Sequence, residues 1–217
     1  GGGDIIAQSI SVSNVTQNNG IANGTGGTIE VKHDITISNI SGTTTGTTQG
    51  NGISLGSGII EAGGNVTITN VSTSGNTDNT SNNGIYAKGS LFADGNITVD
   101  GVAAGHGMFL YQTGVVHAFK DISVSNITKE GKQGMYLADA VSTSKQMCNV
   151  TGVNVTVSNV GGNGILISNH LGNTFVATGT VKITDVIKGR GFSNQGGTVA
   201  VKNLEISNIK ANYNAIE

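Results

Sequence analysis

Carboxylates, histidines and basic residues are the side chains that can carry out acid–base or metal chemistry, and this 217-residue chain has few of them. Charged residues make up 11% of the chain, and arginine occurs once, at Arg190. Glu30 and Glu61 occupy equivalent places in neighbouring copies of a repeat, which predicts carboxylates about 5 Å apart. Such proximity raises the pKa of one of them, as a glycosidase pair requires. The next copies carry Phe92 and His117 instead of a third acid, so solvated surface acids are the preferred interpretation.

A metal site is the second chemistry to consider. Asp94, His106, His117 and Asp121 fall within two copies of the repeat. However, Asp121 aligns with residues that open the same strand in other copies, and short polar side chains at such places cap turns. The aligned residues are Asp34, Asn65, Asn96 and Asn154. We therefore predict no metal ligand, no catalytic residue and no cofactor.

The composition removes several classes of function. The net charge of −2 lacks the excess of positive charge that binding of DNA or RNA requires. No apolar run approaches the roughly 18 residues needed to span a membrane. Cys148 is the single cysteine, so no disulfide within the chain is available, and its neighbours offer no base that would activate the thiol.

A repeated phrase dominates the chain and decides its fold. Its copy at Asp34–Ile40 reads as alternating isoleucines followed by an asparagine and one more isoleucine. Eight copies recur roughly every 28 residues, a spacing typical of solenoids. The first apolar residue of each copy is Ile10, Ile35, Val66, Ile97, Ile122, Val155, Val181 and Leu204.

Two further short apolar runs flank each copy, one upstream and one downstream after a loop and a glycine, as at Gly52–Leu55 and Gly84–Ala87. Each run alternates with period two, so it has one apolar face and one polar face. One turn cannot bury its apolar face alone, whereas stacked turns make one continuous core. The sequence therefore predicts an all-β parallel solenoid of about eight turns of three short strands, with residues 1–217 as a single domain.

The asparagine of the phrase marks a corner. The residues before and after Asn39 both point inward, which requires a sharp turn at Asn39 itself. Asparagine tolerates left-handed backbone better than most residues, and glycine tolerates it best. Gly101 takes the same place in the fourth copy, as this interpretation predicts. Asparagines stacked in this way also form hydrogen bonds along the ladder.

With this asparagine turn and these three strands per repeat, nearly the whole chain resembles the right-handed parallel β-helix superfamily. That superfamily includes pectate lyases, phage tailspikes and the passenger domains of autotransporter and two-partner-secreted bacterial adhesins. The abundance of Thr, Ser, Asn and Gly and the lack of Pro are most similar to the adhesin passengers. The resemblance implies a right-handed β-helix that is secreted or displayed on a bacterial cell surface.

An aromatic stripe is the strongest pointer to function. The outward positions of the third strands carry Tyr86, Phe109, Tyr136 and Leu166 in succession, with Tyr111 two residues beyond Phe109. Contiguous apolar residues on a face that is expected to be solvent-exposed usually mark an interface. Two interpretations stay open, since the stripe either contacts a ligand or is covered by the segment 139–149.

The leading hypothesis is a non-enzymatic adhesin or binding rod that contacts a host surface protein or a glycan. The same hypothesis allows the chain to self-associate through the ends of the β-helix or through the aromatic stripe. The alternatives are a pectate-lyase-like carbohydrate-active enzyme and a structural filament or coat subunit. The domain is expected to be a fragment of a longer chain or an end-to-end stacking unit.

Overall fold

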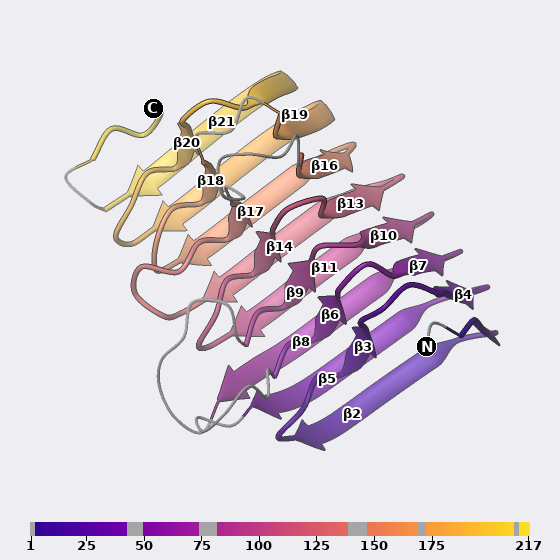
Figure 1. The fold of residues 1–217 in the computed structure, drawn as a ribbon. Coiled ribbons are helices and arrows are strands. Elements are labelled where there is room, and N and C mark those ends of the chain that lie inside the picture. The colour runs from indigo at the N-terminus through magenta and orange to yellow at the C-terminus, as the bar shows by residue number, and fades with distance from the viewer. Residues whose placement is uncertain (1–2, 43–49, 74–81, 139–146, 169–171, 211–212) are drawn as a thin grey trace.

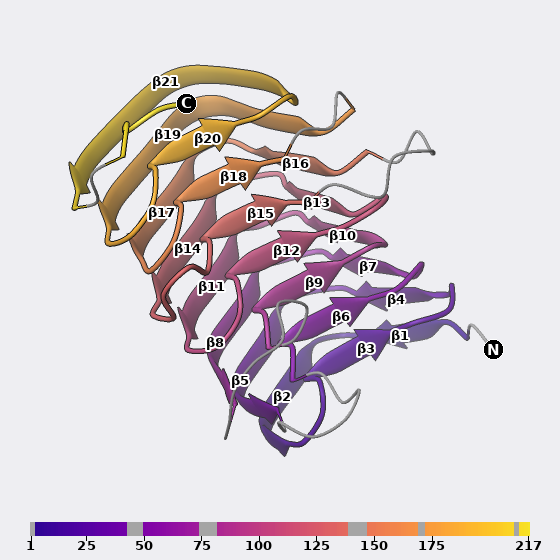
Figure 2. The same ribbon diagram turned by 60° about the vertical axis from the view of Figure 1, so that its left-hand side comes forward.

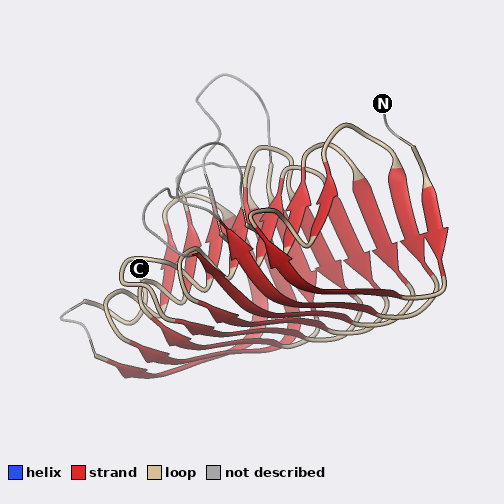
Figure 3. Cartoon of the chain, turned by 90° about the horizontal axis from the view of Figure 1, so that it is seen from below, coloured by secondary structure: helices blue, strands red, loops and turns tan. Residues whose placement is uncertain are grey.

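The alternating runs of the sequence form 21 strands in the computed structural model, and these strands stack into a parallel β-solenoid (Figure 1). The structure describes residues 3–42, 50–73, 82–138, 147–168, 172–210 and 213–217. Every strand pairing within these ranges is parallel, and none of these residues is helical (Figure 3). A helix long and apolar enough to cross a membrane is accordingly not found among them.

Each complete turn contributes a first, a second and a third strand. The first strands are β1 (Ile5–Ala7), β4 (Thr28–Val31), β7 (Ile59–Ala62), β10 (Ser90–Ala93), β13 (Val115–Ala118) and β16 (Asn149–Gly152). The second strands are β2 (Ile10–Thr16), β5 (Ile35–Gly42), β8 (Val66–Thr73), β11 (Ile97–Val102), β14 (Ile122–Ile127) and β17 (Val155–Val160). The third strands are β3 (Ile21–Asn23), β6 (Ile53–Leu55), β9 (Ile85–Ala87), β12 (Met108–Leu110), β15 (Met135–Leu137), β18 (Ile165–Ile167) and β20 (Phe192–Asn194).

Near the C-terminus the first and second strands merge. β19 (Thr174–Val186) and β21 (Thr198–Ile209) each run through both positions, with a register irregularity between Ala177 and Thr180. The prediction of three separate strands per turn is therefore wrong for these two turns, because each strand continues across this irregularity. One 14-stranded sheet thus holds the first and second strands, and a seven-stranded sheet holds the third strands (Figure 2).

The core consists of aligned columns of inward side chains. Ile35 of β5 pairs with Val66 of β8, and Ile97 of β11 pairs with Ile122 of β14. These four side chains are at most 1% exposed. β-Branched residues suit such stacking because they pack well on a pleated surface. The predicted core columns are therefore confirmed.

The asparagine corner adopts the predicted left-handed backbone, with φ of 55° at Asn39, 56° at Asn70 and 74° at Gly101. The Asn70 amide donates to Asn39 Oδ1 over 3.1 Å, so the predicted ladder of hydrogen bonds is also present. Gly101 has no side chain to continue it. The carboxylate of Asp100, one residue earlier, accepts from the Asn126 amide at 2.7 Å in place of the missing side chain.

The glycine before each third strand is required by the core. A Cβ added to Gly20 would lie 2.6 Å from Ile37 Cγ2, and one added to Gly164 would lie 2.5 Å from Ile183 Cγ2. Both distances are far below van der Waals contact. Only glycine lets the chain approach the second strand this closely, which explains why a glycine precedes each third strand.

Candidate functional site

The predicted aromatic stripe lies on the outer face of the seven-stranded sheet. Tyr86 of β9 pairs with Phe109 of β12, which pairs in turn with Tyr136 of β15. Leu166 of β18 follows Tyr136 in the same register. The column predicted from the repeat is therefore the column in the structure.

The rings of this stripe are in mutual contact, with Phe109 at the centre. Its ring centroid lies 5.7 Å from that of Tyr86, 5.3 Å from that of Tyr136 and 6.2 Å from that of Tyr111. Aromatic pairs at these separations attract one another beyond the burial of their area. Phe109 is only 7% exposed, whereas the other stripe residues are half-buried, so its neighbours hold it in place.

Four of the five predicted residues line one hollow of about 380 Å³. These are Phe109, Tyr111, Tyr136 and Leu166, and the rest of the lining is His106, Gly131, Gln133 and Ala138. Tyr86 stands one turn away, where Lys88 Nζ lies 6.0 Å from its ring centroid and 5.3 Å from that of Tyr111. The stripe thus forms a pocket with an adjoining cation–π contact.

The sequence groups His106 with the candidate metal ligands and does not predict its place in this pocket. The His106 ring centroid lies 5.4 Å from those of both Phe109 and Tyr136. Its Nδ1 accepts a hydrogen bond of 3.0 Å from the backbone N–H of Gln133 in the next turn. The proton of the neutral ring is therefore on Nε2.

The position of His106 in the repeat explains its place in the pocket. It precedes the glycine of its third strand, and in other turns that place is held by polar residues whose side chains accept the N–H of the following turn. The backbone N–H groups of Asn51, Asn83 and His106 donate to the side-chain oxygens of Asn19, Asn51 and Asn83, respectively. His106 thus replaces an asparagine within a buried ladder.

His106 is neutral at ordinary pH. Burial of the ring and, to a smaller extent, the nearby positive charge of Lys132 together lower its pKa from 6.5 to about 3. Since the other lining residues carry no ionisable carboxylate or amine, the pocket presents an uncharged aromatic surface.

The segment predicted as a possible cover of the stripe, 139–149, lies largely outside the described residues. Of its described part, Met147 is 54% exposed and Cys148 is fully buried. Asn149, the last residue of this segment, already belongs to the first strand β16, which the sequence does not predict. Burial raises the pKa of the Cys148 thiol to about 12, in keeping with the predicted unreactive cysteine.

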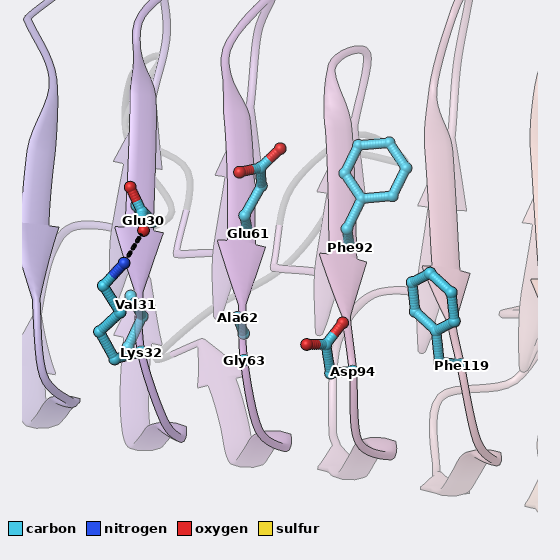
Figure 4. A pocket seen from close by; sticks show the side chains of 9 residues that line it. All are labelled: Glu30, Val31, Lys32, Glu61, Ala62, Gly63, Phe92, Asp94 and Phe119. Carbon is cyan, nitrogen blue, oxygen red and sulfur yellow. Dashed lines mark hydrogen bonds and ion pairs between the residues drawn. The ribbon is translucent and has the colours of Figure 1, made fainter.

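Glu30 and Glu61 are neighbours on the outer face of the first strands, as predicted, since β4 pairs with β7 in this register. Glu30 forms an ion pair with Lys32. Together with Phe92, Asp94 and Phe119 these residues line a second hollow, of about 570 Å³ (Figure 4). The next residues in the register of Glu61 are Phe92 and His117.

The remaining candidates do not converge. Within the described ranges no three His, Cys, Asp or Glu side chains are grouped to hold a metal ion. Asp121 is a member of the predicted capping ladder, because its carboxylate accepts the backbone N–H of Asn154 at 3.0 Å. Asn154 in turn accepts the N–H of Thr180. Arg190 is paired with Glu217, at 3.1 Å.

Comparisons with protein-family models, with curated proteins and with solved structures find no match to this chain.

Proposed function

We propose that this chain is a non-enzymatic binding solenoid of a bacterial surface or secreted adhesin, and that its aromatic pocket binds a neutral glycan. The observation that carries the proposal is the cluster of Phe109, Tyr111 and Tyr136 around one hollow without charged lining. Ligand sites are typically concave and mostly apolar, with a few polar groups that fix orientation. This pocket is concave, and its lining combines aromatic and aliphatic side chains with the polar groups of His106, Gln133 and two tyrosines.

The chemistry of a sugar ring matches these walls. One face of a pyranose presents C–H bonds, which pack against the negative face of an aromatic ring. The phenol groups of Tyr111 and Tyr136 both donate and accept hydrogen bonds, as sugar hydroxyls require. The lining itself carries no charged side chain, which favours a neutral sugar, and Lys88, which lies beside the pocket, is placed over the rings of Tyr86 and Tyr111.

The fold supports the role of a rigid display surface. Stacked turns place the third strands in a continuous row, so that a site can be built from several neighbouring turns (Figure 2). The resemblance of the repeat to adhesin passengers agrees with a binding role and with a secreted or surface location.

The experiment is a glycan array probed with the purified chain, followed by calorimetric titration of the best neutral oligosaccharide. We expect Tyr136→Ala to weaken binding about tenfold or more, a loss of about 1.4 kcal/mol. Tyr213→Ala is the matched control, because Tyr213 is 58% exposed and lies outside the pocket. Equal affinity of both variants, or binding of acidic glycans only, contradicts the proposal.

A polysaccharide-cleaving enzyme is the second candidate, and the adjacency of Glu30 and Glu61 is the observation that favours it. Glu30 already forms an ion pair with Lys32, so Glu61 lacks the second free carboxylate that a catalytic pair of acids requires. The test is release of reducing or unsaturated sugars from polysaccharides. Release that is lost in Glu61→Gln would replace the binding proposal with the enzymatic one.

A further inference from the structure

The outer face of the first strands is a second surface with aromatic character. The ring centroids of His117 and Phe119 are 4.4 Å apart, and those of Phe92 and His117 are 6.3 Å apart. Phe119 is 61% exposed and Val153 is 38% exposed. An exposed aromatic group of this kind, next to a hollow, is typical of an interaction site.

A glycine, Gly63, is part of the lining of the hollow beside these rings. Lys32, Gly63, Asp94 and Phe119 directly follow β4, β7, β10 and β13, and so occupy successive turns. Gly63 contributes no side chain, which leaves a gap between Lys32 and Asp94 (Figure 4). A Cβ at Gly63 would collide with the Lys32 carbonyl oxygen, so the structure itself requires glycine there.

The charge of the hollow is negative. Lys32 is paired with Glu30, so these two side chains compensate each other. Glu61 and Asp94 also line the hollow, and neither belongs to any ion pair formed by described residues. Two uncompensated carboxylates beside the half-buried Phe92 and the exposed Phe119 therefore define the electrostatics of this face.

We propose that this face is a docking site for an arginine-bearing segment of another protein. A guanidinium group binds carboxylates through paired N–H donors and also stacks flat on aromatic rings. Glu61 and Asp94 supply the first interaction, and Phe92 and Phe119 supply the second. A hollow of about 570 Å³ lies within the usual range of ligand sites.

This inference does not rest on the proposed glycan site. The two surfaces belong to different sheets, since β4, β7, β10 and β13 are in the 14-stranded sheet and the aromatic pocket is on the seven-stranded one. They also differ in chemistry, because only the first-strand face has free carboxylates in its lining.

The probe is a capped, fluorescein-labelled peptide of alternating arginine and glycine, measured by fluorescence anisotropy. Its control peptide carries citrulline, which keeps the shape of arginine and removes the charge. We expect micromolar binding of the arginine peptide and binding about tenfold weaker for the citrulline peptide. Citrulline binding of equal strength, or no arginine binding up to about 1 mM, overturns the proposal.

Variants locate the site. The double change Glu61→Gln with Asp94→Asn is expected to weaken binding about tenfold. The control Glu130→Gln with Glu205→Gln alters net charge equally at residues outside the hollow. Equal losses in the two double variants would mean attraction by net charge only, and would overturn the site.

A third variant tests the aromatic part. Phe119→Ser removes an exposed ring, so the melting temperature should change little while the affinity for the arginine peptide falls several-fold. Unchanged affinity in a folded Phe119→Ser protein would remove the ring from the site and contradict the proposal.

Discussion

The backbone N–H of Gln133 donates a 3.0 Å hydrogen bond to Nδ1 of His106 in the preceding turn. The same geometry in earlier turns uses an asparagine oxygen as acceptor, as between Asn83 and Asn51, at 2.8 Å. A histidine fits this buried ladder only as a neutral ring, because protonated Nδ1 would face a donor. The ladder, and not only burial, therefore opposes protonation of His106.

Stability is expected to fall with acidity because of His106. Its pKa is about 3 in the folded chain and about 6.5 when unfolded, so between these values the unfolded state binds the extra proton. The contribution is complete above pH 6.5 and is lost as pH falls, by roughly 1.4 kcal/mol per unit within the window. Urea unfolding at several pH values measures this slope.

The control for this prediction is His106→Asn, which restores the side chain of neighbouring turns. The variant should lose most of the slope between about pH 3 and 6.5. An unchanged slope would show that other groups, and not His106, cause the acid sensitivity.

Gly164→Ala is expected to destabilise the fold. The new Cβ would lie 2.5 Å from Ile183 Cγ2 and from the Gly191 carbonyl oxygen, so backbone or core must shift. Overpacking of this kind costs about 1–3 kcal/mol. Thermal melting of the variant checks this, with Gly24→Ala as the control because nothing lies within 4 Å of its added Cβ. Similar melting temperatures for both variants would refute the steric explanation.

Two substitutions of Asn70 distinguish the contribution of the left-handed backbone conformation to stability from that of the side-chain hydrogen bond. Asn70→Ala keeps φ at 56° without the amide that donates to Asn39, at an expected cost of about 1–2 kcal/mol. Asn70→Gly relieves the left-handed strain and should cost less, since Gly101 occupies the equivalent place. Melting temperatures rank the two variants, and a glycine variant less stable than the alanine one would argue against this account.

Cys148 is expected to resist thiol reagents in the folded chain. Its side chain is fully buried and its pKa is raised to about 12, so almost no thiolate is present at pH 8. Labelling with a chromogenic disulfide reagent should be complete in guanidinium and negligible without it. Rapid labelling of the native protein would show that the site opens.

Much of the fold follows from the sequence because a solenoid repeats one local rule. The inward column that includes Ile35 and Val66, the corner at Asn39 and the outward place of Tyr86 were all readable from alignment of the copies. Period-two alternation fixes which side each residue faces, and stacking then fixes its neighbours in adjacent turns.

The sequence alone determined the parallel solenoid, its core columns and the membership of the aromatic stripe, since these depend on spacing within the chain. Tertiary structure decided what spacing does not encode. It brought His106 against Phe109 and Tyr136, merged the strands of β19, and opened a hollow above Gly63 beside Asp94. These features depend on side-chain volume and hydrogen bonding between turns, which only the packed structure specifies.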